Sequence, residues 1–510
     1  MRPLPKLCIV LAVSFSVSGC SFLHRSQMSD FNSAYSQGNY EGALKSMEFE
    51  QAENGDVDTE GQLLEILHQA ELHRLQGNFQ KASDYYDLAE QGMKHLDTES
   101  ALEEGGEAFM SVMVNDSVSD YEAMMSEAVL VNTYKGLAFL AAGNDEFARV
   151  EFNRADERTR RAIDYFEGEI KEQKDQLEAE AAKAEGDENA EEGDKALFAK
   201  RSLESSELQS TVAENYGQPS EWSVYPEFMV PTSTYLHGLY FLANAETSSD
   251  YSKAKTSLKR VAEMIPESEQ LASDAQLATE LASGEKAPES LNPQVWVVYE
   301  NGLGPVLKEK RFDVPLLLFH GNQQAPAYTG IALPEYSDRS AINGSLLVMA
   351  GTENQSVETE NIGDMGRVFQ TEMEARFPGI LTRAVTSAVV KAVIQNEATE
   401  QLGFWGQIGS AALTAATTQA DLRGWQALPD HWQSARLIRP EDGQIELAHT
   451  DGTRLGTVSI PEQPFTLVYV KRPTKGAPAS VVTLDLQGNN EATVAQLPAE
   501  NQEVNTAGSQ

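Results

Sequence analysis

Residues 77–89 read Gly-Asn-Phe-Gln-Lys-Ala-Ser-Asp-Tyr-Tyr-Asp-Leu-Ala, and this stretch decides the fold that we expect for the first half of the chain. Gly77 is placed to end one helix, because glycine readily takes the left-handed conformation of a helix C-terminus. Large and small residues then follow along one helical face, at Phe79, Ala82, Tyr86 and Ala89. Small residues let two helices approach closely, and large ones fill the space between them. The stretch therefore predicts the second half of a packed helix pair, with Ala70 and Leu72 on the first helix.

The same arrangement recurs at uneven spacing along the chain. The other copies are built on Gly38, Tyr40, Ala43 and Met47; on Gly136, Gly143, Ala148, Phe152 and Ala155; and on Gly238, Tyr251, Ala254, Leu258, Val261 and Pro266. This skeleton resembles the tetratricopeptide repeat (TPR), in which stacked helix pairs share a continuous core. We expect TPR-like helical repeats over 31–165 and further TPR-like helices over 216–284. A generic helix bundle is the alternative.

The region 166–215 separates these two groups of helices. It is dense in Glu, Lys, Gln and Ala over 169–185 and continues into Gly186-Asp187-Glu188-Asn189. A segment with so many charges and so few large apolar residues cannot build a core of its own. The sequence therefore predicts an acidic linker, helical or disordered.

From residue 285 the pattern changes from helices to short strands. Residues 295–299 read Val-Trp-Val-Val-Tyr and are followed by a turn at 301–305. Further strands are expected at 316–319, 331–333, 346–349, 444–447, 454–460 and 465–471, each bounded by turn residues. A helical block over 369–393 lies between them, with a break expected at Pro378-Gly379. The fold class expected is an α-helical TPR-like repeat region followed by a C-terminal α+β domain over 285–473, and then a polar, mostly disordered tail over 474–510 with one more strand at 480–486.

One segment of this domain, 401–420, contains no charged residue. Its Gln, Ser and Thr side chains would all have to be buried in hydrocarbon if it crossed a membrane, and that cost exceeds what its few large apolar residues return. We expect it to lie in the core or at a subunit interface.

The N-terminus resembles a bacterial lipoprotein signal. Arg2 and Lys6 precede an apolar run over 7–17, which ends in Val17-Ser18-Gly19-Cys20. The apolar run is too short to span a bilayer, and the cysteine stands where a lipobox carries its acyl chains. We expect a signal peptide over 1–19, lipidation of Cys20, and a tether over 20–30. Because Ser21 follows the cysteine where Asp would favour inner-membrane retention, the predicted location is the periplasmic face of the outer membrane.

Composition narrows the possible partners. The chain has 78 acidic and 39 basic residues and a net charge of −39. Such a chain repels the nucleic-acid backbone and the surface of an anionic membrane, so we expect no nucleic acid as partner and membrane contact through the lipid alone. Cys8 leaves with the signal and Cys20 carries lipid, which leaves no thiol for a disulfide or a metal.

Three cations stand out in this acidic chain. Arg154, Arg158 and Arg161 are spaced i, i+4 and i+7, which places them on one helical stripe. They are our candidate partner-binding residues, suited to a carboxylate-bearing peptide or glycan. The alternative is a stripe balanced by its acidic neighbours Asp156, Glu157 and Asp164.

No catalytic motif accompanies these features. The sequence has no P-loop, dinucleotide fingerprint, His-Glu-x-x-His zinc motif or Gly-x-Ser-x-Gly elbow. Ser252-Lys253-Ala254-Lys255 matches Ser-x-x-Lys only within a repeat, and His68 and His73 are spaced i, i+5, which does not place both on one helix face. We therefore expect that the chain is not an enzyme and that it has no cofactor, no metal and no catalytic residue. A pair of carboxylates that folding brings together within 293–473, as in a wall-glycan hydrolase, is the alternative.

Several stretches together resemble a family of proteobacterial outer-membrane lipoproteins with TPR-like repeats. They are the lipobox, Tyr134-Lys135-Gly136-Leu137, Glu151-Phe152-Asn153-Arg154-Ala155, and Arg423-Gly424-Trp425-Gln426-Ala427-Leu428-Pro429. The resemblance covers most of the mature chain and supplies no catalytic residue. It implies a cell-wall role, because genes of this family often accompany a lipoprotein activator of peptidoglycan synthases.

These observations predict an outer-membrane-anchored periplasmic scaffold whose TPR-like groove binds an envelope protein. Its most concrete form is a regulator of peptidoglycan synthesis. The alternatives are an assembly helper for outer-membrane or secretion machinery and, as a third choice, a cell-wall glycan hydrolase.

Overall fold

The computed structural model describes residues 24–52, 54–97, 120–186, 191–320, 323–339, 341–350, 355–402, 419–498 and 500–501. The signal peptide, Cys20 and most of the uncharged segment 401–420 lie outside the described residues. After a first helical segment over 24–35, the helices of the first half are α2 (Tyr40–Ser46), α3 (Leu63–Leu75), α4 (Phe79–Gly92), α6 (Met125–Ala141), α7 (Asp145–Gly186), α8 (Glu191–Leu203), α9 (Ser206–Tyr216), α10 (Pro231–Ala243), α11 (Ser248–Met264) and α12 (Glu269–Ser283), and a short 3-10 turn η1 (Lys94–Leu96) follows α4.

Helices α3 and α4, α6 and α7, and α10 and α11 form three helix pairs, with each first helix packed on its second. The turns of the first two pairs contain Gly77 and Gly143 with φ of +82° and +73°, as the sequence predicts. Two further glycines lie where helices meet: a Cβ on Gly136 would stand 3.2 Å from the Phe152 ring, and one on Gly238 would stand 2.7 Å from Leu258 Cγ. The small residues therefore let the two helices of each pair approach closely, as the sequence pattern predicts.

The C-terminal part is an α+β domain whose strands form two packed sheets. The first sheet has the order β12-β11-β10-β1-β7-β6, with β1 (Gln294–Asn301) and β10 (Phe465–Arg472) parallel to each other and the other pairs antiparallel. Its remaining strands are β6 (Glu360–Asp364), β7 (His431–Ile438), β11 (Ala479–Asp485) and β12 (Thr493–Leu497). The second sheet is β13-β9-β8-β4-β5, made of β4 (Leu346–Ala350), β5 (Gln355–Glu358), β8 (Gln444–His449), β9 (Thr453–Ser459) and β13 (Glu500–Asn501). Alternate residues Val295, Val297 and Tyr299 of β1 point into the core between the sheets.

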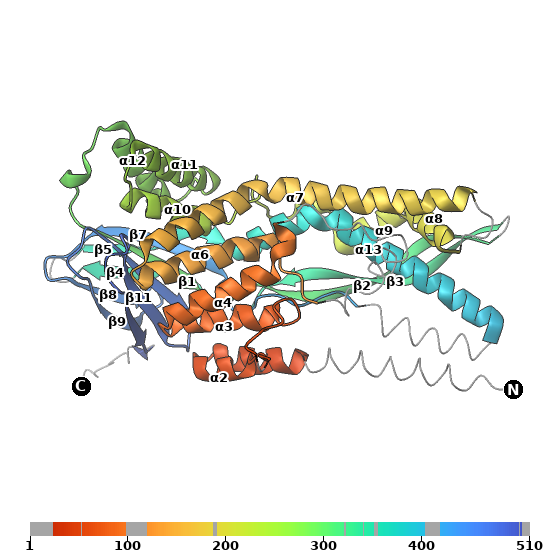
Figure 1. Ribbon diagram of the computed structural model, residues 1–510, viewed down its shortest axis with the longest axis horizontal. Coiled ribbons are helices and arrows are strands. Elements are labelled where there is room, and N and C mark those ends of the chain that lie inside the picture. The colour runs from red at the N-terminus through yellow and green to blue at the C-terminus, as the bar shows by residue number, and fades with distance from the viewer. Residues whose placement is uncertain are drawn as a thin grey trace, which may run out of the picture.

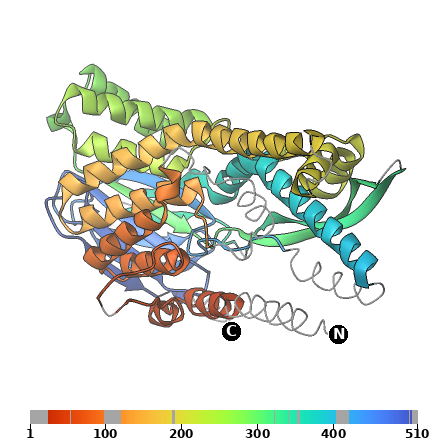
Figure 2. The ribbon, with the colours of Figure 1, turned by 45° about the vertical axis from the view of Figure 1, so that its right-hand side comes forward.

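The other face of the first sheet is covered by the helix pairs (Figures 1 and 2). We call the face formed by α3, α6 and α10 the inner face of the helical region. All of α10 is buried, as is all of α6 except Phe139 and all of α3 except Glu65. Trp296, Trp432 and Tyr469 of the sheet belong to the same core as these helices. The groove that the sequence predicts for a partner is thus filled by the chain's own sheet.

The remaining elements build an arm that extends from this body (Figure 1). It contains the second half of α7, α8, α9, a hairpin of β2 (Val306–His320) and β3 (Gln323–Ser337), and α13 (Met365–Leu402). Its separate core includes Leu177, Phe198, Leu208, Val314, Ile331, Phe377 and Val389.

Three expectations need correction here. The region 166–215 is not a linker, because its sparse apolar residues pack on the hairpin and α13, which lie far away in the sequence. Helix α13 does not break at Pro378; Phe377 and Leu381, on either side of the proline, are buried in the core of the arm. The tail is more ordered than expected, because β12 adds a strand at the edge of the first sheet beyond β11, which matches the strand expected at 480–486.

One helix among the described residues, α13 over Met365–Gln395, is long and apolar enough to cross a membrane. Half of its most apolar window is buried inside the protein. Since the core helix of a water-exposed arm has the same composition, length and hydropathy alone do not assign it to a bilayer.

Buried histidines make the stability of this fold depend on pH. His68 on α3 is uncharged and donates from Nδ1 to the Leu64 carbonyl, while its Nε2 accepts from the Gln426 amide. Burial lowers its pKa from 6.5 to about 3. Below pH 6.5 the unfolded chain therefore binds a proton that the folded chain does not bind. As a result, the free energy of unfolding decreases as the pH is lowered. We expect His68→Gln to reduce this slope by about 1.4 kcal/mol per pH unit between pH 5 and 4, measured by urea unfolding; an unchanged slope would contradict the assignment.

Candidate functional site

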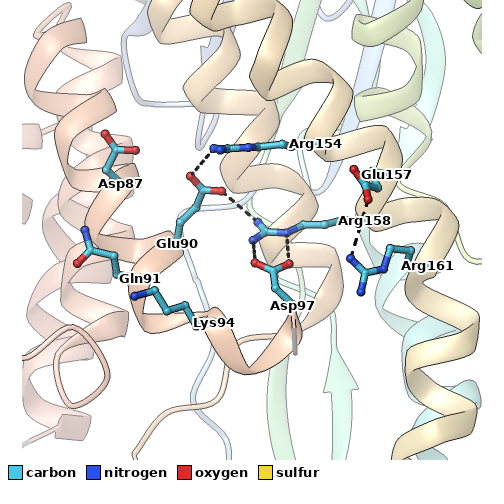
Figure 3. A pocket seen from close by; sticks show the side chains of 9 residues that line it. All are labelled: Asp87, Glu90, Gln91, Lys94, Asp97, Arg154, Glu157, Arg158 and Arg161. Atoms are coloured by element: carbon cyan, nitrogen blue, oxygen red, sulfur yellow. Dashed lines mark hydrogen bonds and ion pairs between the residues drawn. The ribbon is translucent and has the colours of Figure 1, made fainter. Parts of the chain in front are cut away.

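A polar pocket opens on the side of the helical region that faces away from the sheet. It has a volume of about 540 Å³ and lies between α4 with η1 and the first half of α7 (Figure 3). Its walls are Asp87, Glu90, Gln91, Lys94, Asp97, Arg154, Glu157, Arg158 and Arg161. All three predicted arginines thus line one pocket, together with an acidic wall from α4 that the sequence analysis did not identify. The signal for that wall was the i, i+3 spacing of Asp87 and Glu90 near the end of α4.

Arg158 is part of the floor of this pocket. Its side chain is 9% exposed and makes two bonds to the Asp97 carboxylate, from Nε at 3.2 Å and from Nη2 at 2.6 Å. Nη1 donates to Asn132 Oδ1 at 2.8 Å. A guanidinium bound in this bidentate way is fixed in position. Arg158 therefore shapes the site and holds η1 against α7, and it is not a free cation on the stripe.

Arg154 and Arg161 are the accessible cations of the stripe. Their side chains are 52% and 55% exposed. Arg154 lies 3.1 Å from Glu151 and 3.5 Å from Glu90, whereas Arg161 is only within 4.0 Å of Glu157 (Figure 3). The Arg161–Glu157 pair is exposed on both sides and contributes about 0–1 kcal/mol, so an incoming carboxylate can replace Glu157 at little cost. The partners of Arg154 are largely buried, and an incoming carboxylate would add to them on the exposed side of its guanidinium group. The balancing acids of the alternative interpretation are present, but they leave these two guanidinium groups open to solvent.

Lys135 of α6 anchors the acidic wall from below. Its Nζ lies 2.5 Å from Asp87, 2.5 Å from Glu90 and 3.1 Å from Glu151. Burial acts to raise the pKa of Glu90, but Lys135 outweighs it and the pKa is lowered. Burial likewise opposes the charge on Lys135, yet Glu151 and Glu90 raise its pKa. Lys135 and Glu90 therefore stay charged beneath the two exposed arginines, although burial raises the pKa of Glu151.

The carboxylates that folding brings together at the C-terminal domain lie in a different place. Glu300 of β1 and Glu71 of α3 are fully buried, with Lys471 Nζ of β10 at 2.8 Å and 3.0 Å from them. Arg74 binds Glu71 at 2.8 Å and reaches Glu300 at 3.4 Å, and Tyr134 and Tyr469 donate to Glu300. We call Glu71, Arg74, Glu300 and Lys471 the buried ion cluster. It joins helix to sheet with balanced charge, and no solvent reaches its carboxylates.

The block 423–429 lies beside this cluster. The Ala427 carbonyl accepts from Lys471 Nζ at 2.7 Å, and the Trp425 ring packs edge-on against Tyr134 with 5.8 Å between centroids. Comparison with protein-family models, with curated proteins and with solved structures finds no match. The family assignment is therefore a proposal. The contacts of Trp425 and Ala427 give the 423–429 block a packing role.

The remaining titratable candidates do not converge. His68 is bonded to backbone groups, and His73 lies 3.4 Å from the Asn78 amide. Within the part of the chain that the structure describes, no three His, Cys, Asp or Glu side chains are grouped as they would be to hold a metal. The α4–α7 pocket is therefore the candidate functional site.

Proposed function

We propose that this chain is a lipid-anchored scaffold on the periplasmic face of the outer membrane, in the lipoprotein family that its sequence resembles. It binds an envelope protein during cell-envelope assembly, most concretely to regulate peptidoglycan synthesis. The lipobox ending at Cys20 supports the anchor, and the absence of a catalytic motif from the sequence supports a binding role.

The helical region acts as a TPR-like array in this proposal. Three helix pairs with turns at Gly77 and Gly143 and with close contacts at Gly136 and Gly238 support that interpretation. TPR arrays commonly bind through their concave side, but the inner face here is covered by the first sheet. The partner therefore binds on the outer side, at the α4–α7 pocket.

One observation carries this choice of surface. Two half-exposed arginines, Arg154 and Arg161, line a pocket of about 540 Å³ in a chain of net charge −39. Two cations in an acidic surface attract a carboxylate, and the surrounding acidic surface repels it elsewhere. Together these effects orient an acidic segment towards the cations. The partner segment is thus an acidic stretch of a protein. The chain contacts the membrane only through its lipid, and nucleic acid is not its partner.

The test is photo-crosslinking in living cells from position 161. A matched control carries the same photoreactive residue at Lys259, which is exposed on α11. We expect position 161 to capture a peptidoglycan synthase or its activator and position 259 to capture neither.

Other captured proteins distinguish the alternatives. Recovery of porins or of a secretion component would support the assembly-helper function instead. Equal capture from both positions, or none from position 161, would contradict the pocket as the binding surface and return attention to the C-terminal domain.

A further inference from the structure

The exposed stripe of α7 continues beyond the pocket with apolar residues. Phe147 and Val150 are 57% and 45% exposed, although residues of this size are usually covered. With Arg154 and Arg161 they are spaced i, i+3, i+7 and i+14, which places all four side chains on one face of the helix. We call these four residues the α7 stripe.

We infer that the occupant of the α7 stripe is an amphipathic, acidic helix of the partner protein. The inference rests on the proposed function and specifies the kind of segment that is bound. The partner helix lays two apolar residues against Phe147 and Val150, and it directs carboxylates at Arg154 and Arg161. Helix-in-groove recognition uses anchors at this spacing.

The charges on the α7 stripe favour an acidic partner helix over a basic one. The stripe offers two accessible guanidinium groups, while Arg158 beside them is already bound to Asp97. The acids of the opposite wall are partly engaged as well, since Lys135 binds Asp87 and Glu90. An acidic helix can place carboxylates on the exposed sides of Arg154, which also contacts Glu151 and Glu90, and of Arg161, whereas a basic helix would meet both with like charge.

Geometry decides in favour of a helix over an extended strand. An extended peptide gains affinity by pairing its backbone with a free sheet edge, but both walls of this site are helices whose backbone bonds are internal. Apolar anchoring is also preformed, because the Phe147 ring packs on Phe139 with 5.3 Å between centroids. Two helices can instead pack side by side along their length with interlocking side chains.

Two photoreactive residues measure this geometry in cells. Positions 150 and 161 are eleven residues apart on α7, which is about 16 Å along a helix. A photoreactive phenylalanine analogue at each position, in separate strains, is followed by mass spectrometry of the attachment sites. We expect both to attach to one segment, about eleven residues apart, with apolar residues near the first site and Asp or Glu near the second.

An extended partner would give attachment sites about five residues apart, because a strand rises by about 3.3 Å per residue. That result, or attachment to two different proteins, would overturn the inference while leaving the proposed function intact. Failure of position 161 to capture any envelope protein would instead remove the proposed function itself.

Substitutions give a second measurement. Phe147→Ser is expected to reduce capture from position 161 about tenfold, because it removes one apolar anchor. Arg154→Glu is expected to reduce it about fivefold or more. The matched control is Ile163→Ser: Ile163 is 46% exposed on the same helix, but it lies on the far side from the α7 stripe. Equal losses from Phe147→Ser and Ile163→Ser would contradict the stripe as the contact surface.

Discussion

Replacing Lys471 with methionine is expected to lower the free energy of unfolding by about 3–5 kcal/mol, because it leaves one carboxylate of the buried ion cluster without a cation. Lys471 is 1% exposed and lies within 3.0 Å of both Glu71 and Glu300. Burial acts to raise the pKa of Glu300, yet Lys471 and Arg74 lower it to about 2. Without Lys471 one buried carboxylate must either remain charged in an apolar surrounding or take up a proton. Urea unfolding followed by tryptophan fluorescence measures the loss.

A matched control separates burial from mere loss of charge. Lys171→Met removes a lysine that also pairs with an aspartate, Asp175 at 2.7 Å, but both side chains are more than half exposed. That substitution is expected to change stability by less than about 0.5 kcal/mol. The double variant Glu300→Gln with Lys471→Met removes one charge of each sign and is expected to recover part of the loss. A Lys471→Met protein as stable as the Lys171→Met control would contradict the role of the cluster.

Replacing Cys20 with serine is expected to move the protein from the membrane fraction to the soluble periplasm. Each buried methylene contributes about 0.8 kcal/mol, so the loss of several acyl chains removes nearly all of the anchoring energy. The net charge of −39 offers no substitute attraction to an anionic bilayer. Fractionation followed by immunoblotting measures the change.

The control for this prediction is Ser21→Asp, which keeps the lipid and alters only the sorting signal. That variant should stay on membranes but shift towards the inner membrane. A Cys20→Ser protein that still sediments with membranes after a carbonate wash would contradict lipid-only attachment. Helix α13 would then be the next segment to test, since its length and hydropathy are those of a membrane span.

The helix pairs could be predicted because their signals are local. The turn glycines Gly77 and Gly143, and the small residues opposite Phe152 and Leu258, lie within one or two helices of each other in the sequence. Periodicity also located most strands, such as 295–299 within β1 and 465–471 within β10.

What escaped the sequence analysis depends on contacts between distant segments. Nothing local to α3 indicates that Glu71 and Arg74 pair with Glu300 and Lys471, more than two hundred residues away. The 166–215 region looked like a linker because its apolar partners on β2, β3 and α13 follow much later in the chain. The coverage of the inner face by the sheet is likewise a tertiary property.

Part of the candidate site, its arginines, could be predicted from the sequence. Helical spacing placed Arg154, Arg158 and Arg161 on α7, and all three line the pocket. Their different roles could not be read from spacing, because Asp97 and Asn132, which bind Arg158, come from other elements. The apolar part of the α7 stripe was missed for the opposite reason: only the structure shows that Phe147 and Val150 are left uncovered.

The central claim is that the sheet keeps the inner face closed while the partner binds outside, and a disulfide lock tests it most directly. A Cβ on Gly363 of β6 would stand 2.6 Å from Thr232 Oγ1 of α10, so the two positions are in contact, and cysteines there can be joined after a small shift. With no other thiol expected in the mature chain, Gly363→Cys and Thr232→Cys can be joined cleanly in the oxidising periplasm. The account predicts that the locked protein still captures its partner from position 161. Loss of capture on locking, and its return on reduction, would contradict the account and show that the partner enters the inner groove.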